Sequence, residues 1–236
     1  MKVVAVTSQK GGTGKTTLSG HLAVQAERCG AGPVALIDTD PQGSLTNWWN
    51  VRGLETPAFV QTSIAALSAD LARLGEAGIK LVIIDTPPAI TWTIVEVIKV
   101  SDLVVIPVRP SPHDLAAAGS TVDLVEDLGK PMVFVINSAS QRARITGEAA
   151  VALSQHGTVA PTTVHNRTDF AASMIDGRTV MEIARARRSA EEIESLWQYL
   201  ARRLARLSQD SAQRSLPLAA SEKDAYRAPE LHEGVA

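Results

Sequence analysis

Short runs of apolar and β-branched residues recur along the chain, at residues 3–7, 34–38, 81–85, 103–108 and 132–137. Each run is nearly continuous rather than alternating with polar residues, which is typical of strands that helices cover on both faces of a parallel sheet. The segments between the runs show helical spacing of apolar positions, at residues 16–28, 63–74, 90–100, 114–128 and 145–155. The repeated β-α-β order predicts an α/β fold with a single doubly wound, mostly parallel sheet flanked by helices.

The last third of the chain predicts a sixth strand near residues 159–164 and helices near residues 180–186 and 190–207. From Ser208 onward the chain is rich in Ser, Ala, Gln and charged residues, and two prolines interrupt it. We therefore expect one domain at residues 1–207 and a loosely ordered C-terminal tail at residues 208–236. The composition, 45% apolar and 20% charged, is that of an ordinary globular protein.

The first predicted strand runs into a glycine-rich loop, and a predicted helix follows it. The loop consists of Lys10, Gly11, Gly12, Thr13, Gly14, Lys15, Thr16 and Thr17. Glycines let successive backbone N–H groups point inward, and a helix N-terminus adds partial positive charge, so this order predicts a phosphate-binding loop (P-loop) for ATP. Lys15 would reach the β- and γ-phosphates, Thr16 would place its hydroxyl on Mg²⁺, and Thr17 would lie near the α-phosphate.

Acidic side chains follow two other predicted strands. Asp38 ends one strand, Asp40 comes two residues later, and Asp85 ends the strand at residues 81–85. Open α/β sheets bind ligands at the carboxyl ends of their strands, so these side chains are placed to meet the P-loop. Asp85 has the Walker-B arrangement and could act on Mg²⁺ through a water molecule. Capping of the turn before Pro41 is an alternative role for Asp40.

The loop departs from the standard P-loop pattern, because Gln9 stands where that pattern has glycine and an extra lysine, Lys10, follows. This segment resembles the deviant Walker-A loop of the ParA/MinD family of ATPases. The resemblance covers about residues 1–207, and residues 107–112 are similar to small plasmid-type ParA proteins that lack an N-terminal DNA-reading domain. It implies that Lys10 crosses a dimer interface to the partner's nucleotide.

The resemblance also implies roles for residues at the strand ends. The chain would hydrolyse ATP to ADP and phosphate with Mg²⁺, Asp38 would support the Mg²⁺ shell, and Asp40 would orient or activate the attacking water. Lys10, Lys15 and Asp40 are then the catalytic residues. An Asn near the end of the fifth strand contacts adenine in the family, which makes Asn137 a candidate, because an amide can both donate and accept. A helix cap or turn cap at Asn137 and Ser138 is the alternative.

The family dimer binds DNA without sequence preference, and the charge of this chain is unevenly distributed. The net charge is −2, yet residues 142–206 contain ten Arg, no Lys and seven acids, which gives +3. By resemblance in position, the candidate DNA-binding residues are Arg167, Arg178, Arg185, Arg187, Arg188, Arg202, Arg203 and Arg206. Binding through phosphates would fall steeply with salt. The alternative for each arginine is a solvated helix face or a pair with Glu182, Glu191, Glu192 or Glu194.

The resemblance implies a positioning ATPase. ATP drives formation of a homodimer, the dimer binds non-specific DNA, and a ParB-like or adaptor protein stimulates hydrolysis and release. The cargo would be a plasmid, a chromosome region or another assembly. No secretory leader is recognised, no apolar stretch approaches 18 residues, and Cys29 is the single cysteine, so a cytoplasmic, nucleoid-associated protein is expected.

Two alternatives share the ATP site. A MinD-like membrane-associated positioning ATPase would need a basic amphipathic helix at the C-terminus, and the last predicted helix has an apolar stripe at Ile193, Leu196, Trp197, Leu200, Leu204 and Leu207. Core packing explains this stripe more simply, so membrane association is not expected. A metabolic or redox enzyme on this scaffold would need cluster cysteines, a tyrosine cluster or substrate-binding residues, none of which is recognised.

Overall fold

The computed structural model describes residues 1–89 and 92–215, the last five of these by their backbone alone. In this part of the chain the strands form a seven-stranded sheet in the order β3-β2-β4-β1-β5-β6-β7, with every pairing parallel. The strands are β1 (Lys2–Val6), β2 (Val34–Asp38), β3 (Ala58–Phe59), β4 (Leu81–Asp85), β5 (Leu103–Val108), β6 (Met132–Ile136) and β7 (Thr158–Val159). The predicted α/β fold with a doubly wound parallel sheet is confirmed.

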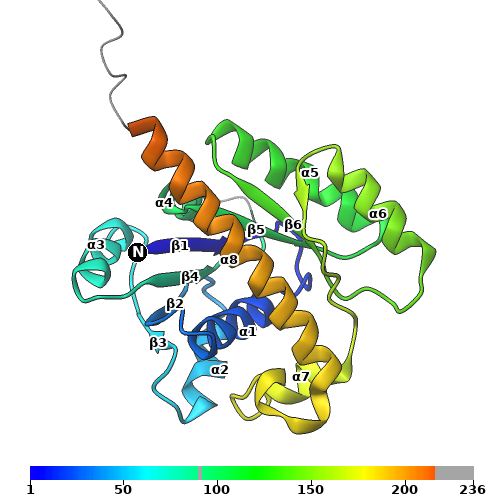
Figure 1. Cartoon of the computed structure of the whole chain (residues 1–236), viewed down its shortest axis with the longest axis horizontal. Coiled ribbons are helices and arrows are strands. Elements are labelled where there is room, and N and C mark those ends of the chain that lie inside the picture. The colour runs from blue at the N-terminus through cyan, green and yellow to red at the C-terminus, as the bar shows by residue number, and fades with distance from the viewer. Residues whose placement is uncertain (90–91, 216–236) are drawn as a thin grey trace, which may run out of the picture.

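Helices cover both faces of the sheet (Figure 1). One layer contains α1 (Lys15–Arg28), α2 (Ser44–Arg52), α7 (Thr168–Met174) and α8 (Arg187–Ser215). The other contains α3 (Leu67–Glu76), α4 (Trp92–Val100), α5 (Pro112–Asp127) and α6 (Arg144–Ser154). Val4 and Val6 of β1 pack toward the first layer, whereas Val3 and Ala5 pack toward the second. Because both faces are buried, the strands read as continuous apolar runs.

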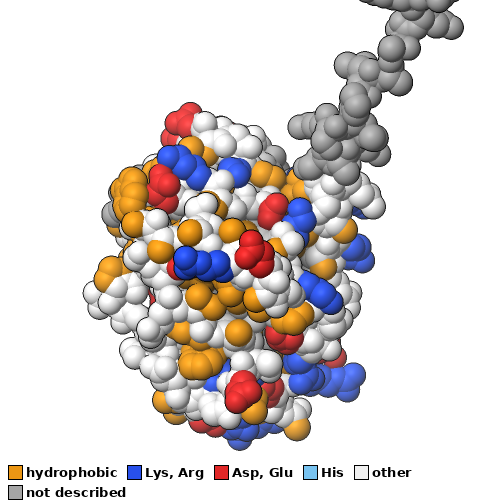
Figure 2. All heavy atoms as spheres, turned by 90° about the vertical axis from the view of Figure 1, so that its left-hand side faces the viewer, with side chains coloured by type: hydrophobic (Ala, Val, Ile, Leu, Met, Phe, Trp, Pro, Cys, Tyr) orange, Lys and Arg blue, Asp and Glu red, His pale blue; other side chains and the backbone are white. Residues whose placement is uncertain are grey.

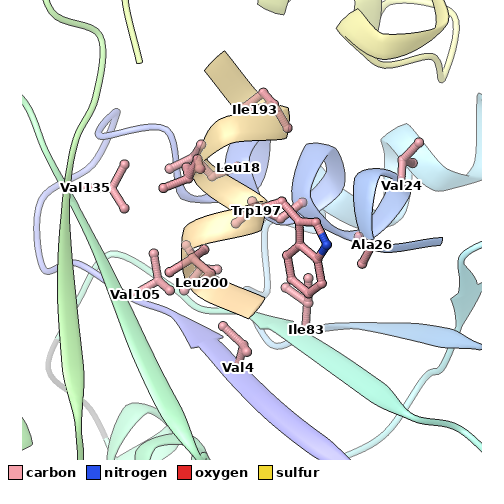
Figure 3. Close-up of a cluster of buried hydrophobic side chains, with 14 of the residues drawn as sticks. Val4, Leu18, Val24, Ala26, Ile83, Val105, Val135, Ile193, Trp197 and Leu200 are labelled. Atoms are coloured by element: carbon pink, nitrogen blue, oxygen red, sulfur yellow. The ribbon is translucent and has the colours of Figure 1, made fainter. Parts of the chain in front are cut away.

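Helix α8 packs lengthwise on the sheet and on α1. Ile193, Trp197 and Leu200 are buried in one cluster with Leu18 of α1 and Val4 of β1 (Figure 3). The apolar stripe that the sequence showed is therefore part of the core, as the simpler interpretation expected. Among the helices that the structure describes, none has the length and apolar content that a membrane crossing requires.

Several boundaries differ from the prediction for local reasons. The strand expected at residues 159–164 is reduced to β7, because Pro161 has no N–H to donate to the ladder. The helix expected at residues 180–186 is replaced by two short 3₁₀ turns, η1 (Val180–Glu182) and η2 (Ala184–Ala186). Ile183 between them has extended backbone angles (φ −119°, ψ 111°), which end the first turn.

Three elements were missed, and one helix is longer than predicted. Strand β3 and helices α2 and α7 had no prediction. Helix α8 begins at Arg187 and continues to Ser215, so residues 208–215 are helical where the tail was expected to begin. The rest of the predicted tail, residues 216–236, and the start of the helix predicted at residues 90–100 lie outside the described residues.

A buried histidine connects α1 to the segment that precedes α8. His21 Nδ1 lies 2.7 Å from the carbonyl oxygen of Thr17, and its Nε2 lies 3.2 Å from the backbone nitrogen of Val180. A carbonyl can only accept and a backbone N–H can only donate, so the proton of the neutral ring is on Nδ1. Burial lowers the pKa of His21 from 6.5 to about 4. Charging this ring would place a second N–H against that of Val180.

We expect the protein to lose stability as the pH falls from about 6.5 to about 4. In this window the unfolded chain binds a proton at His21 that the folded chain does not, so the free energy of unfolding decreases. The contribution approaches about 3 kcal/mol at the lower end. Urea unfolding at several pH values measures it. His21→Asn should flatten this pH dependence and the exposed His156→Asn should not, and an unchanged slope in His21→Asn would contradict the assignment.

Candidate nucleotide site

The sheet register brings the ends of three strands together. Val6 at the end of β1 pairs with Asp85 at the end of β4, and Asp38 at the end of β2 pairs with Asp85 from the other side. The loops that follow these strands therefore leave the sheet at the same edge. The P-loop and the two carboxylate segments meet there, as the sequence predicted.

The conformation of the P-loop depends on the backbone angles of two glycines and on a hydrogen bond from the side-chain amide of Asn137. Gly12 and Gly14 have φ angles of +74° and +90°, which L side chains rarely adopt. A Cβ at Gly14 would lie 2.2 Å from Asn137 Nδ2, and that amide donates to the carbonyl oxygen of Thr13 at 2.6 Å. Gly14 is also the N-cap of α1 and provides no side-chain cap, so the first N–H groups of the helix can bind an anion.

Asn137 has a contact that the sequence did not predict. Its amide nitrogen bonds to the P-loop, whereas the residue as a whole also lines the cavity. The side-chain oxygen is thus the group that could accept from a purine. A contact with adenine at Asn137 stays a prediction.

The buried carboxylate of Asp85 connects the end of β4 to α1. Thr16 Oγ1 donates to Asp85 Oδ2 at 2.7 Å, and Ser19 Oγ lies 3.2 Å from Asp85 Oδ1. Burial raises the pKa of Asp85 to about 7, and the charge of Asp38 adds to this, whereas the bond from Thr16 opposes it. A cation beside this carboxylate would stabilise its charged form.

These residues fit the ligand preference of Mg²⁺. A carboxylate and a hydroxyl are oxygen donors, and Mg²⁺ binds to few protein groups together with phosphates and water. Between residues 1–89 and 92–215, no three His, Cys, Asp or Glu side chains form a metal-binding group, so a dense all-protein cage is absent there. Thr16 and Asp85 are the residues that would hold the ion with the nucleotide's phosphates.

The carboxylate of Asp38 accepts hydrogen bonds from the loop that follows β2 and from the start of α2. Its Oδ1 accepts from the backbone nitrogen of Asp40 at 3.0 Å, and its Oδ2 accepts from both the backbone nitrogen and the hydroxyl of Thr46 at 2.9 Å. The carboxylate thus fixes the loop between β2 and α2. A supporting role for Asp38 around the metal, through this loop, is compatible with these bonds.

Asp40 lies on the cavity wall. Its Oδ1 accepts from the backbone nitrogen of Gln42 at 3.0 Å, which is the turn cap that the sequence left open as an alternative. The same carboxylate also interacts electrostatically with Lys15, which lines the same cavity. Burial lowers the pKa of Lys15, and the charges of Asp85 and Asp40 act in the opposite direction. Asp40 can therefore both cap the turn and face a bound phosphate.

The two lysines of the loop have different surroundings. Lys15 is buried and lines the cavity, with its Nζ 3.3 Å from the carbonyl oxygen of Lys10. The side chain of Lys10 is 36% exposed and is not among the cavity-lining groups, and its Nζ lies 2.7 Å from Asp114 Oδ2. One ammonium group thus points into the phosphate site and the other lies outside it.

Asp114 and Ser111 were missed by the sequence analysis. Ser111 is the N-cap of α5 and accepts from the backbone nitrogen of Asp114, and its hydroxyl also bonds to the Asp114 carboxylate. Burial would raise the pKa of Asp114, but the bonds from Lys10 and Ser111 and the charges of Lys10 and Arg109 hold it below its usual value. The pattern Ser-Pro-x-Asp could have predicted the helix start. It could not have predicted the contact with Lys10.

A cavity of about 760 Å³ extends from the P-loop toward α7. Its far wall includes the loop residues His165, Asn166 and Arg167 and the first turn of α7 with Phe170. Arg109 lies at the P-loop end, where a Cβ on Gly12 would be 3.4 Å from Arg109 Nη2. The volume and the two ends suit a nucleotide, whose phosphates would lie in the P-loop and whose base would lie toward this far wall.

The candidate DNA-binding arginines fall into two groups. Arg167 pairs with Glu192 at 2.8 Å and Arg187 with Glu191 at 2.9 Å, as the alternative of internal pairing allowed. Arg178 pairs with Asp176 at 2.6 Å, a partner that the sequence analysis did not name. In the described part of the chain, no ion pair involves Arg185, Arg188, Arg202, Arg203 or Arg206, and all of these except the half-buried Arg203 are exposed.

The face of the molecule that carries α3 has a mixed distribution of charge. Figure 2 shows Lys and Arg side chains on this face interspersed with Asp and Glu and with apolar groups. Positive and negative charges close together cancel at the range of a DNA phosphate. This face therefore presents mixed charge to a polyanion, and contact of the exposed arginines of α8 with DNA stays a prediction.

The fold and the site define a P-loop nucleotide-binding protein. The CobQ/CobB/MinD/ParA nucleotide binding domain family matches residues 4–180, and the chain belongs to this family of ParA/MinD-type ATPases. The resemblance stated from the P-loop is confirmed.

Named relatives are similar to this chain over different lengths. Maintenance of carboxysome distribution protein A from Halothiobacillus neapolitanus is 29% identical over 203 residues, which are 82% of this chain and 93% of that protein. The protein of the same name from Gloeobacter kilaueensis is 40% identical over 124 residues, 51% of this chain and 55% of that protein. The chromosome-partitioning ATPase Soj from Thermus thermophilus is 28% identical over 154 residues, 53% and 61% respectively.

Solved structures share the fold. An ATP complex of McdA from Cyanothece has a TM-score of 0.73 at 18% identity and covers 85% of this chain and 96% of its own. The septum site-determining protein MinD from Pyrococcus horikoshii, complexed with Mg-ADP, has a TM-score of 0.71 at 14% identity and covers 84% and 95%. At these identities the likeness is evidence for the fold alone.

We expect Lys15→Ala to lose productive ATP binding. The variant removes a buried ammonium group that lines the phosphate end of the cavity, and loss of a charge-assisted bond of this kind lowers affinity by roughly 100-fold. Equilibrium binding of a fluorescent ATP analogue measures it. Lys99→Ala, which removes an exposed lysine on α4, is the control and should bind normally. Wild-type affinity in Lys15→Ala would contradict the P-loop assignment.

Proposed function

We propose that this protein is a ParA-like ATPase that forms a homodimer with ATP, binds DNA without sequence preference and positions a cargo. A ParB-like or adaptor protein stimulates hydrolysis and so releases the dimer, which is associated with the nucleoid in the cytoplasm. The observation that carries this proposal is the position of Lys10. It follows the deviant P-loop pattern, lies outside its own phosphate cavity and is partly exposed, so it can reach the nucleotide of a second subunit.

The chemistry is hydrolysis of the γ-phosphate by in-line attack of water. Lys15 of one subunit and the partner subunit's Lys10 stabilise the charge that develops on the γ-phosphate oxygens. Asp40 orients the water from the cavity wall. Bound Mg²⁺ would supply neutralising charge to the β- and γ-phosphates, held by Thr16 and Asp85. Because Lys10 has to leave Asp114 and cross an interface, a single subunit is expected to turn over slowly.

DNA binding rests on the exposed arginines. Arg185, Arg188, Arg202 and Arg206 make no ion pair among the described residues, which leaves their charges available to phosphates. A dimer doubles this set and brings two copies to one duplex. Such contacts give affinity without base recognition, which suits movement over the whole nucleoid.

The names of the relatives support one of the three proposed kinds of cargo over the others. The relative from Halothiobacillus neapolitanus that matches most of this chain is named for the maintenance of carboxysome distribution, whereas Soj is named for chromosome partitioning. The longer match favours a protein assembly as the cargo over a plasmid or a chromosome region.

Asp40→Ala should bind ATP and dimerise but hydrolyse ATP at least about 100-fold more slowly, because it loses the group that positions the water. Phosphate release and size-exclusion chromatography with ATP measure the two properties. Asp123→Ala on the exposed face of α5 controls for the loss of one acidic side chain. Normal turnover in Asp40→Ala would exclude the proposed role.

The decisive experiment is binding to non-specific duplex DNA with ATP, with ADP and without nucleotide, over a series of salt concentrations. We expect binding that requires ATP and weakens linearly in log affinity against log salt, with the slope reduced by about 0.9 per lost phosphate contact in Arg188→Ala or Arg202→Ala. Lys10→Ala should bind ATP but not DNA. Absence of DNA binding in every nucleotide state would exclude the proposed function and direct the search to liposomes.

A further inference from the structure

One glutamate of α8 holds the far wall of the nucleotide cavity. Glu192 Oε2 accepts from the backbone nitrogen of His165 at 3.0 Å, and its Oε1 lies 2.8 Å from both His165 Nδ1 and Arg167 Nη2. The Glu192 side chain is 13% exposed, and that of Arg167 is 18% exposed. Bonds that involve ionised groups are the stronger ones, so these largely buried contacts fix the wall to the helix.

A second contact joins the same two segments. Ser189 lies one helical turn before Glu192 and donates its hydroxyl to Asp169 Oδ2 at 2.9 Å. Asp169 belongs to the first turn of α7, directly after the wall residues. Two side chains on one side of α8 therefore hold the segment at residues 165–169. A displacement of this segment would be transmitted to the first turns of α8.

The first turns of α8 also carry exposed basic side chains. Arg187 and Arg188 open the helix, and Arg185 precedes it in η2. These arginines are exposed, whereas Glu192 faces the wall from within the same two turns. The helix therefore touches the cavity wall with one set of residues and presents positive charge to solvent with another.

We propose that Glu192 is a positioning residue that couples occupancy of the nucleotide cavity to DNA binding through the arginines at the start of α8. A nucleotide in the cavity restrains the wall at His165 and Arg167, and Glu192 transmits this restraint to the start of α8. The first turn of α8 and the η2 turn before it then hold Arg188 and Arg185 in the arrangement that binds phosphates. The coupling rests on the proposed function and specifies its regulation. By linkage, DNA strengthens ATP binding by the same factor by which ATP strengthens DNA binding.

Glu192→Gln tests the coupling with little change of shape. A glutamine has one acceptor oxygen and one NH₂ group, so it keeps at most part of the three contacts and turns a donor toward another donor. Glu192→Ala removes all three. Glu194→Gln removes one negative charge from the same helix and is the matched control. Thermal unfolding verifies that each variant is folded.

The measured quantity is the gain in DNA affinity that ATP gives over ADP. We expect this gain to fall at least about fivefold in Glu192→Gln and further in Glu192→Ala, with Glu194→Gln at the wild-type value. ATP binding to the P-loop should persist in Glu192→Gln. An unchanged gain in both Glu192 variants would overturn the inference. Loss of ATP binding or of folding in Glu192→Gln would also overturn it, because Glu192 would then only support the wall.

Hydrogen exchange separates this inference from the proposed function. In the wild type, ATP should slow exchange of backbone amides in the first turns of α8, and in Glu192→Gln it should not. If the wild type binds no DNA in any nucleotide state, the proposed function fails, yet the exchange experiment still decides whether Glu192 transmits the nucleotide's effect. Equal protection by ATP in the wild type and in Glu192→Gln, or no protection in either, would overturn the coupling.

Discussion

The arrangement of the site depends on Asp85 at the end of β4. Its carboxylate accepts from Thr16 and lies beside Ser19 of α1, and its carbonyl oxygen accepts from both the backbone nitrogen and the hydroxyl of Thr39. One residue thus fixes the P-loop helix and the loop that carries Asp40 to the same point of the sheet. The arrangement is costly, because the carboxylate is fully buried and its pKa is raised to about 7. A cation bound beside Asp85 would stabilise the charged carboxylate and so offset the free-energy cost of burying it.

Contacts from α1 and from α2 meet on the segment before α8. From α1, His21 accepts from the backbone nitrogen of Val180, and from α2, Arg52 forms a bidentate pair with Glu182 at 2.8 and 3.0 Å. Glu182 Oε2 also accepts from the backbone nitrogen and the hydroxyl of Thr179. The segment between α7 and α8 is therefore held by both helices that begin at the nucleotide loops. A buried, fully bonded pair of this kind defines one arrangement rather than several.

Most of the fold and of the phosphate site could be predicted, because the signals for them are local. A buried strand, a glycine-rich loop and a helix N-terminus are consecutive in sequence, so the pattern at residues 3–17 contains the whole unit. Helices α2 and α7 escaped because they are short and owe their stability to long-range contacts, such as the bond from Trp48 Nε1 to the carbonyl of Arg178 at 3.2 Å. Strand β3 has two residues and no periodicity to recognise. The partners of Lys10 and Arg167 lie 104 and 25 positions away, beyond any local pattern.

The contrast between local patterns and long-range contacts also explains what the distribution of charged residues could and could not show. An excess of arginine between residues 142 and 206 is visible in the sequence, but the free charge depends on which side chains fold back onto a carboxylate. Arg167 is held inside by Glu192, and Arg178 and Arg187 have acidic partners at the surface. Surface pairs contribute little to stability and exchange readily with a phosphate, whereas the largely buried pair does not. Arg167 therefore belongs to the nucleotide cavity and its support, and the arginines that we propose for DNA contact are exposed ones of α8 and of the turn before it.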